Sequence, residues 1–339
     1  MLPDSARELK ARLSRRLSDA PRRTVLSRGV EAEALDQGGA IGWSGVALGL
    51  TPVAPNSVHL AIRLVDEADA EVVLAGLDDA ARAEVDVRVI GRVRLLGTPA
   101  PGWSPEELQR RVRPLRPGLS VGHPDVTAGT LGGFVRLPGQ EGLLALSNNH
   151  VLAASDVATE GDAALQPGVA DGGTADDRIG TLTAFVRFSP EPGNLVDAAV
   201  AALADGVAAD PGALPGGALA ARVSAVDDVD PDELVEKVGR TTGHTRGRIT
   251  AVEVDGVGVQ YDAGVVTFDD QVEIEGLTGA FSAGGDSGSV IWRSRDRAPL
   301  GLLFAGSTTG GSAGGGVTFA NPLATVLREL GVEWVSARG

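Results

Sequence analysis

The chain has 339 residues, of which 43% are hydrophobic and 22% are charged. This composition excludes wholesale disorder, and the length predicts two domains or one large double unit. The 47 glycines and 19 prolines indicate many turns and short strands. There is no cysteine, which excludes a disulfide scaffold, a cysteine nucleophile and a zinc site built on thiolates.

Charge and apolar runs exclude further classes of protein. The formal net charge is −15 although the first 30 residues are basic, and an acidic body is a poor surface for nucleic acid. No run approaches 18 apolar residues, so no membrane span is predicted, and the charged N-terminus lacks a signal-peptide pattern. The four histidines show no metal-ligand spacing. We therefore expect a cytoplasmic protein with no metal, nucleic-acid or membrane partner.

Residues 1–30 are expected to form an amphipathic helix followed by a linker. Leu9, Leu13 and Leu17 recur at intervals of four, with charged residues between them. We favour packing of this stripe on its own domain or on a neighbouring subunit over a membrane-surface or partner-binding role. Residues 31–117 predict a small α/β domain, in which we find no cluster of catalytic residue types.

Residues 118–339 predict a mainly β structure. Short apolar or alternating runs are separated by Gly, Pro, Asn and Asp clusters, and no long helix is expected before ANPLATVLRELGVEW near the end. A stretch rich in Ala, Pro, Gly and Asp at 204–233 divides this part. The pattern is typical of a sandwich or of two closed barrels, at about 118–205 and 234–339.

Three segments carry the residue types of nucleophilic catalysis. LLALSNNHVLA contains His150, NLVDAAVAAL contains Asp197 in an apolar run, and SAGGDSGSVIW contains Ser287 in a Gly-rich loop. A serine hydroxyl needs an imidazole to accept its proton, and that imidazole needs a carboxylate to fix its tautomer. Because a carboxylate in an apolar run must be hydrogen-bonded, we predict that Asp197 is the partner of His150.

The glycines of GGDSGS permit backbone conformations that other residues resist. The N–H groups of Gly285 and Ser287 can therefore converge on a developing oxyanion. The order His150, Asp197, Ser287, with gaps of 47 and 90 residues, suits the first two on one barrel and the third on the next. Alone, each residue has a structural explanation, as a core histidine, a turn cap or a turn serine. Together and in this order they favour catalysis.

The three segments resemble those of chymotrypsin-fold (trypsin-like) serine peptidases over residues 118–339. GGDSGS is similar to the nucleophile motif of that family, SNNHV to its catalytic-histidine segment and VDAAVA to its catalytic-aspartate segment. More narrowly, the order of VGHPDVTAGTLG, LSNNHVLA, LQPG, GRTTGHTRG, GGDSGS, GLLFAGS and ANP resembles the cytosolic peptidases related to the plant narrow-leaf protease and their bacterial homologues. That group also has an extra N-terminal region.

This resemblance implies two antiparallel six-stranded β-barrels, preceded by the small N-terminal α/β domain and helix. It implies an intracellular serine endopeptidase that hydrolyses peptide bonds in protein or peptide substrates through an acyl-enzyme. His150 would be the general base and acid, Asp197 its orienter and Ser287 the nucleophile. This chemistry requires no cofactor. A homo-oligomer formed through the N-terminal region is also expected.

Two features depart from the family pattern. The cystine beside the catalytic histidine of vertebrate members is missing, and no Ile-Val or Ile-Ile activation cleavage site precedes the barrel. In zymogen-type relatives a freshly cut N-terminus pairs with the aspartate before the nucleophile, so Asp286 needs another cation. We predict an ion pair between Asp286 and Arg240, which lies in GRTTG.

The same resemblance suggests residues that contact the substrate. GLLFAGS matches the strand that pairs with the substrate backbone, which makes Phe304, Ala305 and Gly306 candidates. Phe281, six residues before Ser287, matches the base of the primary pocket and argues against cleavage after Lys or Arg. We expect a small or medium apolar substrate residue there.

Two other functions stay open. One is a peptide-binding or scaffolding protein with little turnover, because a misaligned oxyanion loop is invisible in the sequence. The other is an assembly subunit in which the N-terminal region forms oligomers. His123 and His244 are interpreted as structural. The Gly-rich stretch 310–316 lacks the following Lys and Ser or Thr of a phosphate-binding loop.

Overall fold

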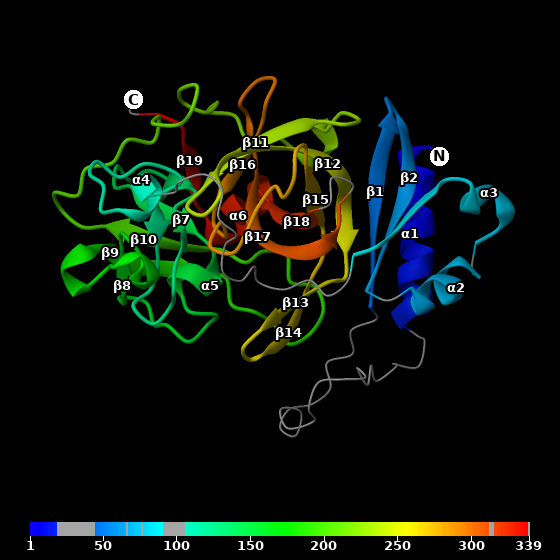
Figure 1. Ribbon diagram of the computed structural model, residues 1–339, viewed down its shortest axis with the longest axis horizontal. Coiled ribbons are helices and arrows are strands. Elements are labelled where there is room, and N and C mark those ends of the chain that lie inside the picture. Colours follow the sequence, from blue (N-terminus) through cyan, green and yellow to red (C-terminus); the bar gives the residue numbers. More distant parts are fainter. Residues whose placement is uncertain (19–44, 66, 76, 91–105, 312–314, 338–339) are drawn as a thin grey trace.

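The computed structural model describes residues 1–18, 45–65, 67–75, 77–90, 106–311 and 315–337. Within these ranges the chain is mainly β, with most strands after residue 118 and a smaller group of helices and strands before residue 90 (Figure 1). No helix in the described ranges is long and apolar enough to cross a membrane. The boundary expected at residue 30 and the linker before it lie outside the described residues, and the boundary expected at 117 stays a prediction.

The elements before residue 110 are α1 (Pro3–Ser18), β1 (Val46–Ala54), β2 (Ser57–Leu64), α2 (Ala68–Leu74), α3 (Asp79–Arg82), β3 (Val85–Val89) and α4 (Glu106–Gln109). β1 and β2 form an antiparallel hairpin, and β3 pairs in parallel with β2. The helix expected near the N-terminus is present as α1. Its residues Leu9 and Leu13 are buried in one cluster with β1 and β2, so the apolar stripe packs on its own chain.

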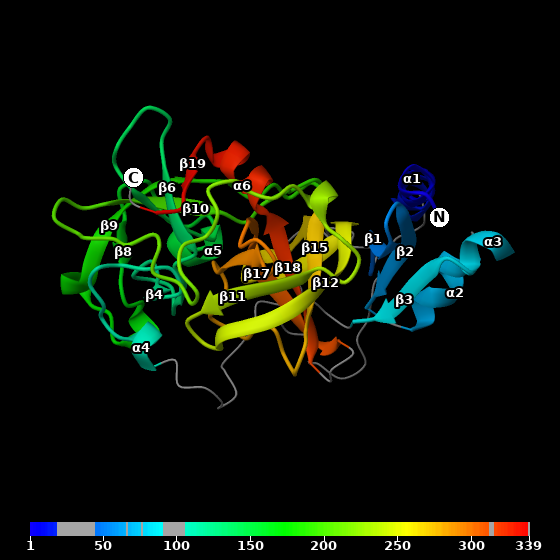
Figure 2. The ribbon, with the colours of Figure 1, turned by 90° about the horizontal axis from the view of Figure 1, so that it is seen from above.

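Six strands of the C-terminal part close into a barrel. They are β11 (Leu234–Gly239), β12 (Gly243–Asp255), β15 (Gln271–Gly276), β16 (Val290–Arg293), β17 (Pro299–Gly310) and β18 (Gly316–Pro322). The pairing order β11-β16-β17-β18-β15-β12 returns from β12 to β11, and Figure 2 shows these last two strands side by side. The prediction of a closed six-stranded barrel after residue 234 is confirmed. Between β12 and β15 the chain forms a separate hairpin, β13 (Val257–Tyr261) and β14 (Gly264–Phe268).

The remaining strands form a second sheet and a short pair. They are β4 (Ser120–Val121), β5 (Gly129–Thr130), β6 (Gly133–Arg136), β7 (Leu144–Ser147), β8 (Ala163–Leu165), β9 (Arg178–Phe185), β10 (Ala199–Leu203) and β19 (Glu333–Val335). The sheet has the order β19-β6-β7-β10-β9-β8, and β4 pairs with β5. Among the described residues β8 and β19 do not pair with each other, and only a bridge between Gly122 and Leu165 links β8 to the segment of β4, so the expected closure of a barrel at 118–205 stays a prediction.

The last strand, β19, does not belong to the barrel that is expected over residues 234–339. Residues 333–335 were expected in the second barrel, but β19 pairs with β6 of the other sheet. The reason is α6 (Leu323–Leu330), which follows β18 and carries the chain back across the molecule (Figure 2). Gly331, in a left-handed conformation with φ 64°, ends the helix and turns the chain into β19.

The N-terminal strands extend the barrel sheet. β1 pairs with β12, which gives a nine-stranded sheet that ends β12-β1-β2-β3. A buried ion pair reinforces this junction, since Arg63 Nε on β2 lies 2.6 Å from Glu273 Oε2 on β15. The independence of residues 31–117 as a domain therefore stays a prediction.

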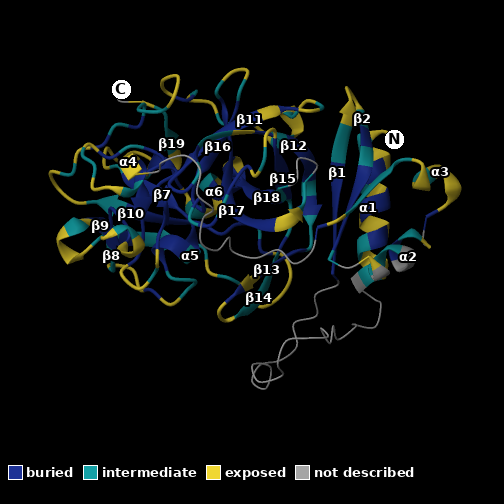
Figure 3. Cartoon of the chain, in the orientation of Figure 1, coloured by how far each residue is buried: buried dark blue, intermediate teal, exposed yellow. Residues whose placement is uncertain are grey.

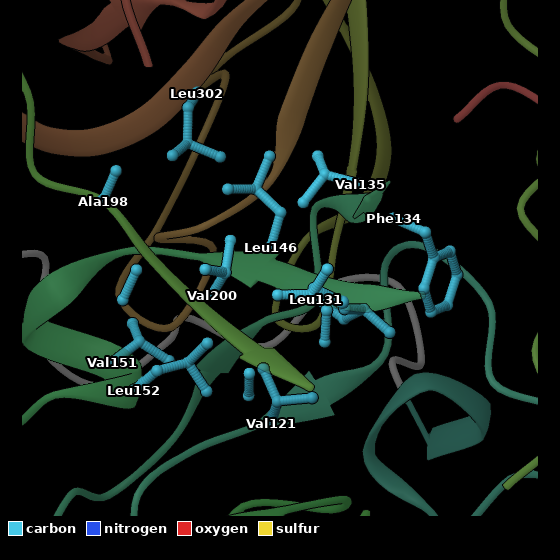
Figure 4. Packing of buried hydrophobic residues seen from close by; sticks show 14 of the residues in the cluster. Val121, Leu131, Phe134, Val135, Leu146, Val151, Leu152, Ala198, Val200 and Leu302 are labelled. Atoms are coloured by element: carbon cyan, nitrogen blue, oxygen red, sulfur yellow. The ribbon is translucent and has the colours of Figure 1, made fainter. Parts of the chain in front are cut away.

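Buried side chains follow the strands, whereas turns and outer helix faces are exposed (Figure 3). One cluster joins the second sheet to the barrel: Leu146, Val151, Ala198 and Val200 lie in it with Leu302 of β17 (Figure 4). Apolar packing on both sides of the junction therefore fixes the ends of β7, β10 and β17 relative to one another.

Candidate active site

His150 and Asp197 lie at the same end of two neighbouring strands. β7 ends at Ser147 and continues into the short helix α5 (Asn149–Leu152), which carries His150 in its first turn. Asp197 stands two residues before β10, and Ser147 pairs with Ala199 at the start of that strand. Antiparallel pairing thus brings together two residues that are 47 positions apart in the sequence.

The Asp197 carboxylate has no exposed surface, and His150 donates to both of its oxygens. His150 Nδ1 lies 2.6 Å from Oδ2, and the His150 backbone N lies 3.2 Å from Oδ1. An ionised carboxylate only accepts hydrogen bonds, so Nδ1 carries the proton and Nε2 keeps the lone pair that a general base needs.

The backbone of Asp197 is fixed as well. Asn148 Nδ2 donates to its carbonyl oxygen at 2.6 Å, and its own N–H donates to Asn321 Oδ1 at 3.0 Å. Asn321 in turn donates to Gln271 Oε1 at 2.6 Å. All these side chains are buried, so a network that spans the sheet and the barrel holds the aspartate in place.

Ser287 comes to the same junction from the barrel side. It lies in the loop before β16, and its carbonyl accepts a hydrogen bond from Thr130 N at 2.7 Å. A Cβ built on Gly129 would contact both the Val151 side chain and the Ser287 carbonyl, so only Gly129 separates the residue after His150 from this loop. The structure therefore brings the three predicted residues to the junction of sheet and barrel.

The Ser287 hydroxyl is held weakly. Its Oγ donates to Phe304 O at 3.4 Å, which is long for a hydroxyl donor. Across the described ranges, no hydrogen bond joins Ser287 to His150. Catalytic hydrogen bonds in free enzymes are often long or poorly aligned and tighten only when substrate is bound.

The loop before Ser287 holds two unpaired backbone donors. In the part of the chain that the structure describes, Gly285 N and Ser287 N have no hydrogen-bond partner, whereas Asp286 N and Gly288 N are both bonded. Gly285 has φ 91°, a left-handed conformation that glycine adopts readily. Both N–H groups are therefore available to donate to an acceptor oxygen.

Two threonine hydroxyls fix this loop. Thr241 Oγ1 donates to Gly284 O at 2.6 Å, and Thr130 Oγ1 donates to Gly285 O at 2.8 Å. The C=O and N–H of a trans peptide point in opposite directions, so Thr241 keeps the Gly285 N–H turned away from itself. Neither threonine is identified from the sequence, although both lie in segments on which the family resemblance rests.

The predicted ion pair between Arg240 and Asp286 is wrong, because the cation beside Asp286 is Lys237. Lys237 Nζ lies 3.1 Å from Asp286 Oδ2, and both side chains are fully buried. Arg240 pairs with Asp171 instead. Gly239 faces the Asp286 carboxylate and leaves room for it, since a Cβ there would clash. Arg240 stands directly after β11, and its guanidinium contacts Asp171 and not Asp286.

Asp286 has further donors on both oxygens. Oδ1 accepts from Thr241 N at 2.9 Å and Thr242 N at 3.1 Å, and Oδ2 accepts from Thr242 Oγ1 at 2.6 Å. Burial lowers the pKa of Lys237 from its ordinary value of 10.5, and the Asp286 charge opposes this shift. One signal for Lys237 was present, because it is one of only two lysines and stands in the apolar run LVEKVG.

Among the described residues, the predicted substrate strand has no strand partner on one edge beyond residue 302, although Ala305 and Gly306 are themselves buried. Ala305 and Gly306 pair with β18, whereas β16 pairs with β17 only at residues 299–302. Beyond them, no strand covers the second edge of β17 in the described ranges. The side chains of Phe304 and Phe281 are buried, at 0% and 1% exposure, so Phe304 offers a substrate only its backbone. The substrate contacts of all four residues stay predictions.

The two histidines that are interpreted as structural, His123 and His244, each contact an acidic side chain. His123 Nε2 lies 3.3 Å from Asp162 Oδ2, and His244 contacts Glu236 and stacks on Trp292. Nowhere in the described ranges do three or more His, Asp or Glu side chains gather as a metal site would require.

This chain is similar to several proteins of known structure. It is similar to Thermobifida fusca protease A, with 18% identity, a TM-score of 0.44 and coverage of 66% of this chain and 100% of that chain. It is also similar to Cellulomonas bogoriensis chymotrypsin, with 20% identity, TM-score 0.44 and coverage of 66% and 100%, and to Nocardiopsis protease, with 18%, 0.46, 66% and 100%.

Its structural neighbours are bacterial serine proteases of the chymotrypsin fold. No protein-family model matches the chain, and no curated protein matches it. The narrower resemblance to the narrow-leaf group stays a prediction. At these identities, the activity of this chain has to be argued from its own residues.

Proposed function

We propose that this protein is an intracellular serine endopeptidase that uses Ser287 as nucleophile, His150 as general base and acid, and Asp197 as its orienter. The observation that carries the proposal is the buried Asp197 carboxylate 2.6 Å from His150 Nδ1, because it leaves Nε2 as a base at the junction where Ser287 lies. The intracellular setting rests on the sequence alone.

In the proposed reaction, His150 Nε2 takes the proton of Ser287 Oγ as this oxygen attacks the substrate carbonyl. The carbonyl oxygen becomes an oxyanion, and the N–H groups of Gly285 and Ser287 donate to it. Asp197 stabilises the imidazolium, which then protonates the leaving amine. Water repeats the sequence on the acyl-enzyme and releases the carboxylic acid product.

The proposed substrates are extended segments of proteins or peptides. An extended backbone could pair with the edge of β17 that no described strand pairs with, at Ala305 and Gly306, and this pairing would orient the scissile bond toward Ser287. We propose a small or medium apolar residue before that bond, because the Phe281 side chain is uncharged and the Lys237 ammonium, 5.7 Å from its ring centroid, is already paired with Asp286. No cofactor takes part in these steps.

The test is hydrolysis of an unfolded protein, such as fluorescein-labelled casein, by the full chain. We expect the wild type to release fluorescent peptides and Ser287→Ala to be inactive. His123→Ala is the matched control, since His123 also contacts a carboxylate in this half of the molecule but lies outside the proposed site. Equal hydrolysis by wild type and Ser287→Ala would reject the proposal.

One observation favours the second candidate, a peptide-binding protein with little turnover. Ser287 Oγ donates to Phe304 O and leaves His150 Nε2 without it. If this geometry persists with substrate, labelled peptides will bind equally to wild type and Ser287→Ala and neither will cleave them. Mass spectrometry of the bound peptides separates the two functions.

A further inference from the structure

Tyr261 links the β13–β14 hairpin to the site. The phenol oxygen lies 2.7 Å from Asp197 Oδ2, the same oxygen that accepts from His150 Nδ1. Tyr261 is 3% exposed, and its ring meets the His150 ring edge-on at 6.1 Å. It is the only tyrosine in the chain.

The hairpin that carries Tyr261 is fastened to the segment before Asp197. Asn194 Nδ2 donates to Thr267 O at 3.1 Å, and Asp269 N donates to Asn194 O at 2.9 Å. Figure 1 shows β13 and β14 as a separate hairpin below the barrel strands. The hairpin and the Asp197 segment are therefore held together at more than one point, which fixes the backbone on both sides of the hydrogen bond between Tyr261 and Asp197.

The direction of the hydrogen bond follows from the charges around the phenol. Tyr261 faces Asp197, His150 and, at longer range, Asp156. Burial raises the pKa of Tyr261 well above its ordinary value of 10, and the negative charge of Asp197 raises it further. The phenol is therefore protonated and donates, and the carboxylate accepts.

We propose that Tyr261 is a positioning residue for the peptidase reaction: its hydroxyl fixes the Asp197 carboxylate, and thereby the orientation and basicity of His150. This inference rests on the proposed function. Two donors on Oδ2 restrict the orientation of the carboxylate, and this in turn restricts the orientation of the His150 ring. The phenol also withdraws negative charge from Oδ2, so the imidazolium is stabilised less than by an unshared carboxylate.

Two changes to the Tyr261 side chain should shift the pH at which the His150 ring titrates in opposite directions. Tyr261→Phe removes the donor, so the ring of His150 should titrate at higher pH. Biosynthetic 3-fluorotyrosine makes the phenol more acidic and a stronger donor, so that titration should move to lower pH. Because Tyr261 is the only tyrosine, the fluorinated residue enters at this one position. If Tyr261 contributed packing alone, the two changes would not shift the His150 titration in opposite directions.

The experiment measures two quantities on the full chain. NMR follows the His150 ring titration and the low-field Nδ1–H resonance, and the second-order rate of fluorophosphonate labelling of Ser287 is recorded against pH. We expect the acid limb of the labelling profile to shift as the titration does. The plateau should fall about tenfold in Tyr261→Phe, since one charge-assisted hydrogen bond is lost. Phe188→Leu is the control, because Phe188 packs on Tyr261 without a hydrogen bond to Asp197.

The results separate this inference from the proposed function. Unchanged titration and resonance in both Tyr261 replacements, or equal shifts in Phe188→Leu, would overturn the positioning role. If wild type is not labelled at all, the proposed function fails, and the NMR titration still decides whether Tyr261 controls the Asp197–His150 pair. If Tyr261→Phe does not fold, the fluorotyrosine protein alone must give the downward shift for the inference to stand.

Discussion

Asp197 is buried, and within the described residues no Lys or Arg pairs with it, so hydrogen-bond donors compensate its charge. His150 supplies two of them, and the Tyr261 hydroxyl supplies a third. A carboxylate in such a place is costly unless its hydrogen bonds are satisfied, so this arrangement has to be built into the fold. The carboxylate defines the His150 tautomer.

Asp197→Asn tests that dependence. The Asn amide can donate to Nδ1, which would move the ring proton to Nε2 and leave no base for Ser287. We expect casein hydrolysis to fall about 10³–10⁴-fold. Asp162→Asn is the matched control, because Asp162 contacts His123 outside the site. A rate within threefold of wild type, in a protein with unchanged thermal unfolding, would contradict the assigned role.

Single residues differ in how far the sequence identifies them. His150, Asp197 and Ser287 stand in motifs whose residue types state their chemistry. Lys237 and Tyr261 carry no such motif, and Tyr261 is 64 positions from the carboxylate that it contacts. Contacts of this kind depend on strand pairing and on where each side chain points, and neither is visible in local spacing.

At the scale of elements, the β11–β12 hairpin organises the loop before Ser287. Lys237, Thr241 and Thr242 all come from this hairpin and all contact residues 284–286. The loop is thereby ordered without a cleaved N-terminus. Removing the buried cation should therefore disorder the loop while the barrel itself persists.

Lys237→Met tests this device, because methionine keeps much of the side-chain volume and removes the charge. We expect fluorophosphonate labelling to slow about 10²-fold, since the oxyanion donors lose their fixed positions. Lys10, the only other lysine, pairs with Asp255 and not with the loop before Ser287. Lys10→Met should therefore be labelled at the wild-type rate. Equal labelling of Lys237→Met and wild type would mean that Asp286 needs no cation.

Alkaline pH should have the same effect as that substitution. Burial lowers the pKa of Lys237, so this group loses its proton below pH 10.5 and the ion pair with Asp286 disappears. Between the lowered pKa and the ordinary one, the unfolded chain binds more protons, so this group makes the folded state more stable as pH rises. Because the ion pair is lost at alkaline pH, the labelling rate of the wild type should fall there. This alkaline fall should be absent in Lys237→Met. A profile that falls only together with thermal unfolding would contradict this assignment.

The sequence predicts individual helices and strands better than it predicts which strands pair with one another. The alternating runs indicate the strands, and ANPLATVLRELGVEW indicates α6. The sequence pattern does not show that β19 returns to β6, since that pairing depends on the direction in which α6 leaves β18. Nor does it show the pairing of β1 with β12, because an edge strand has the same pattern whichever partner it has.

At the scale of the whole molecule, the N-terminal strands are attached to the barrel. Arg63 lies between Glu273 and Asp86, and its side chain is fully buried. The burial of Leu9 and Leu13 against β1 and β2 removes the leucine stripe as a reason to expect oligomers. A homo-oligomer stays a prediction that rests on the resemblance, and light scattering on the full chain tests it.

Arg63→Ala tests the attachment. The substitution leaves Glu273 buried without its bidentate partner, and breaking such a pair costs about 3–5 kcal/mol. Urea unfolding should show this loss, and Arg63→Met combined with Glu273→Leu should recover most of it, because both charges of the fully buried pair are then removed and Asp86 keeps Arg88 as its partner. Arg136→Ala, in an exposed pair with Glu333, is the control. A loss below 1 kcal/mol would mean that the strand pairing alone holds the N-terminal part.

The central claim is that Ser287 is an activated nucleophile beside a formed oxyanion site. The most direct measurement is the intact mass of the full chain after exposure to a fluorophosphonate, for wild type and for Ser287→Ala. One adduct on the wild type and none on the variant is the predicted result. No adduct on either protein, or equal labelling of both, would contradict the claim, and the first of these outcomes would favour the peptide-binding function.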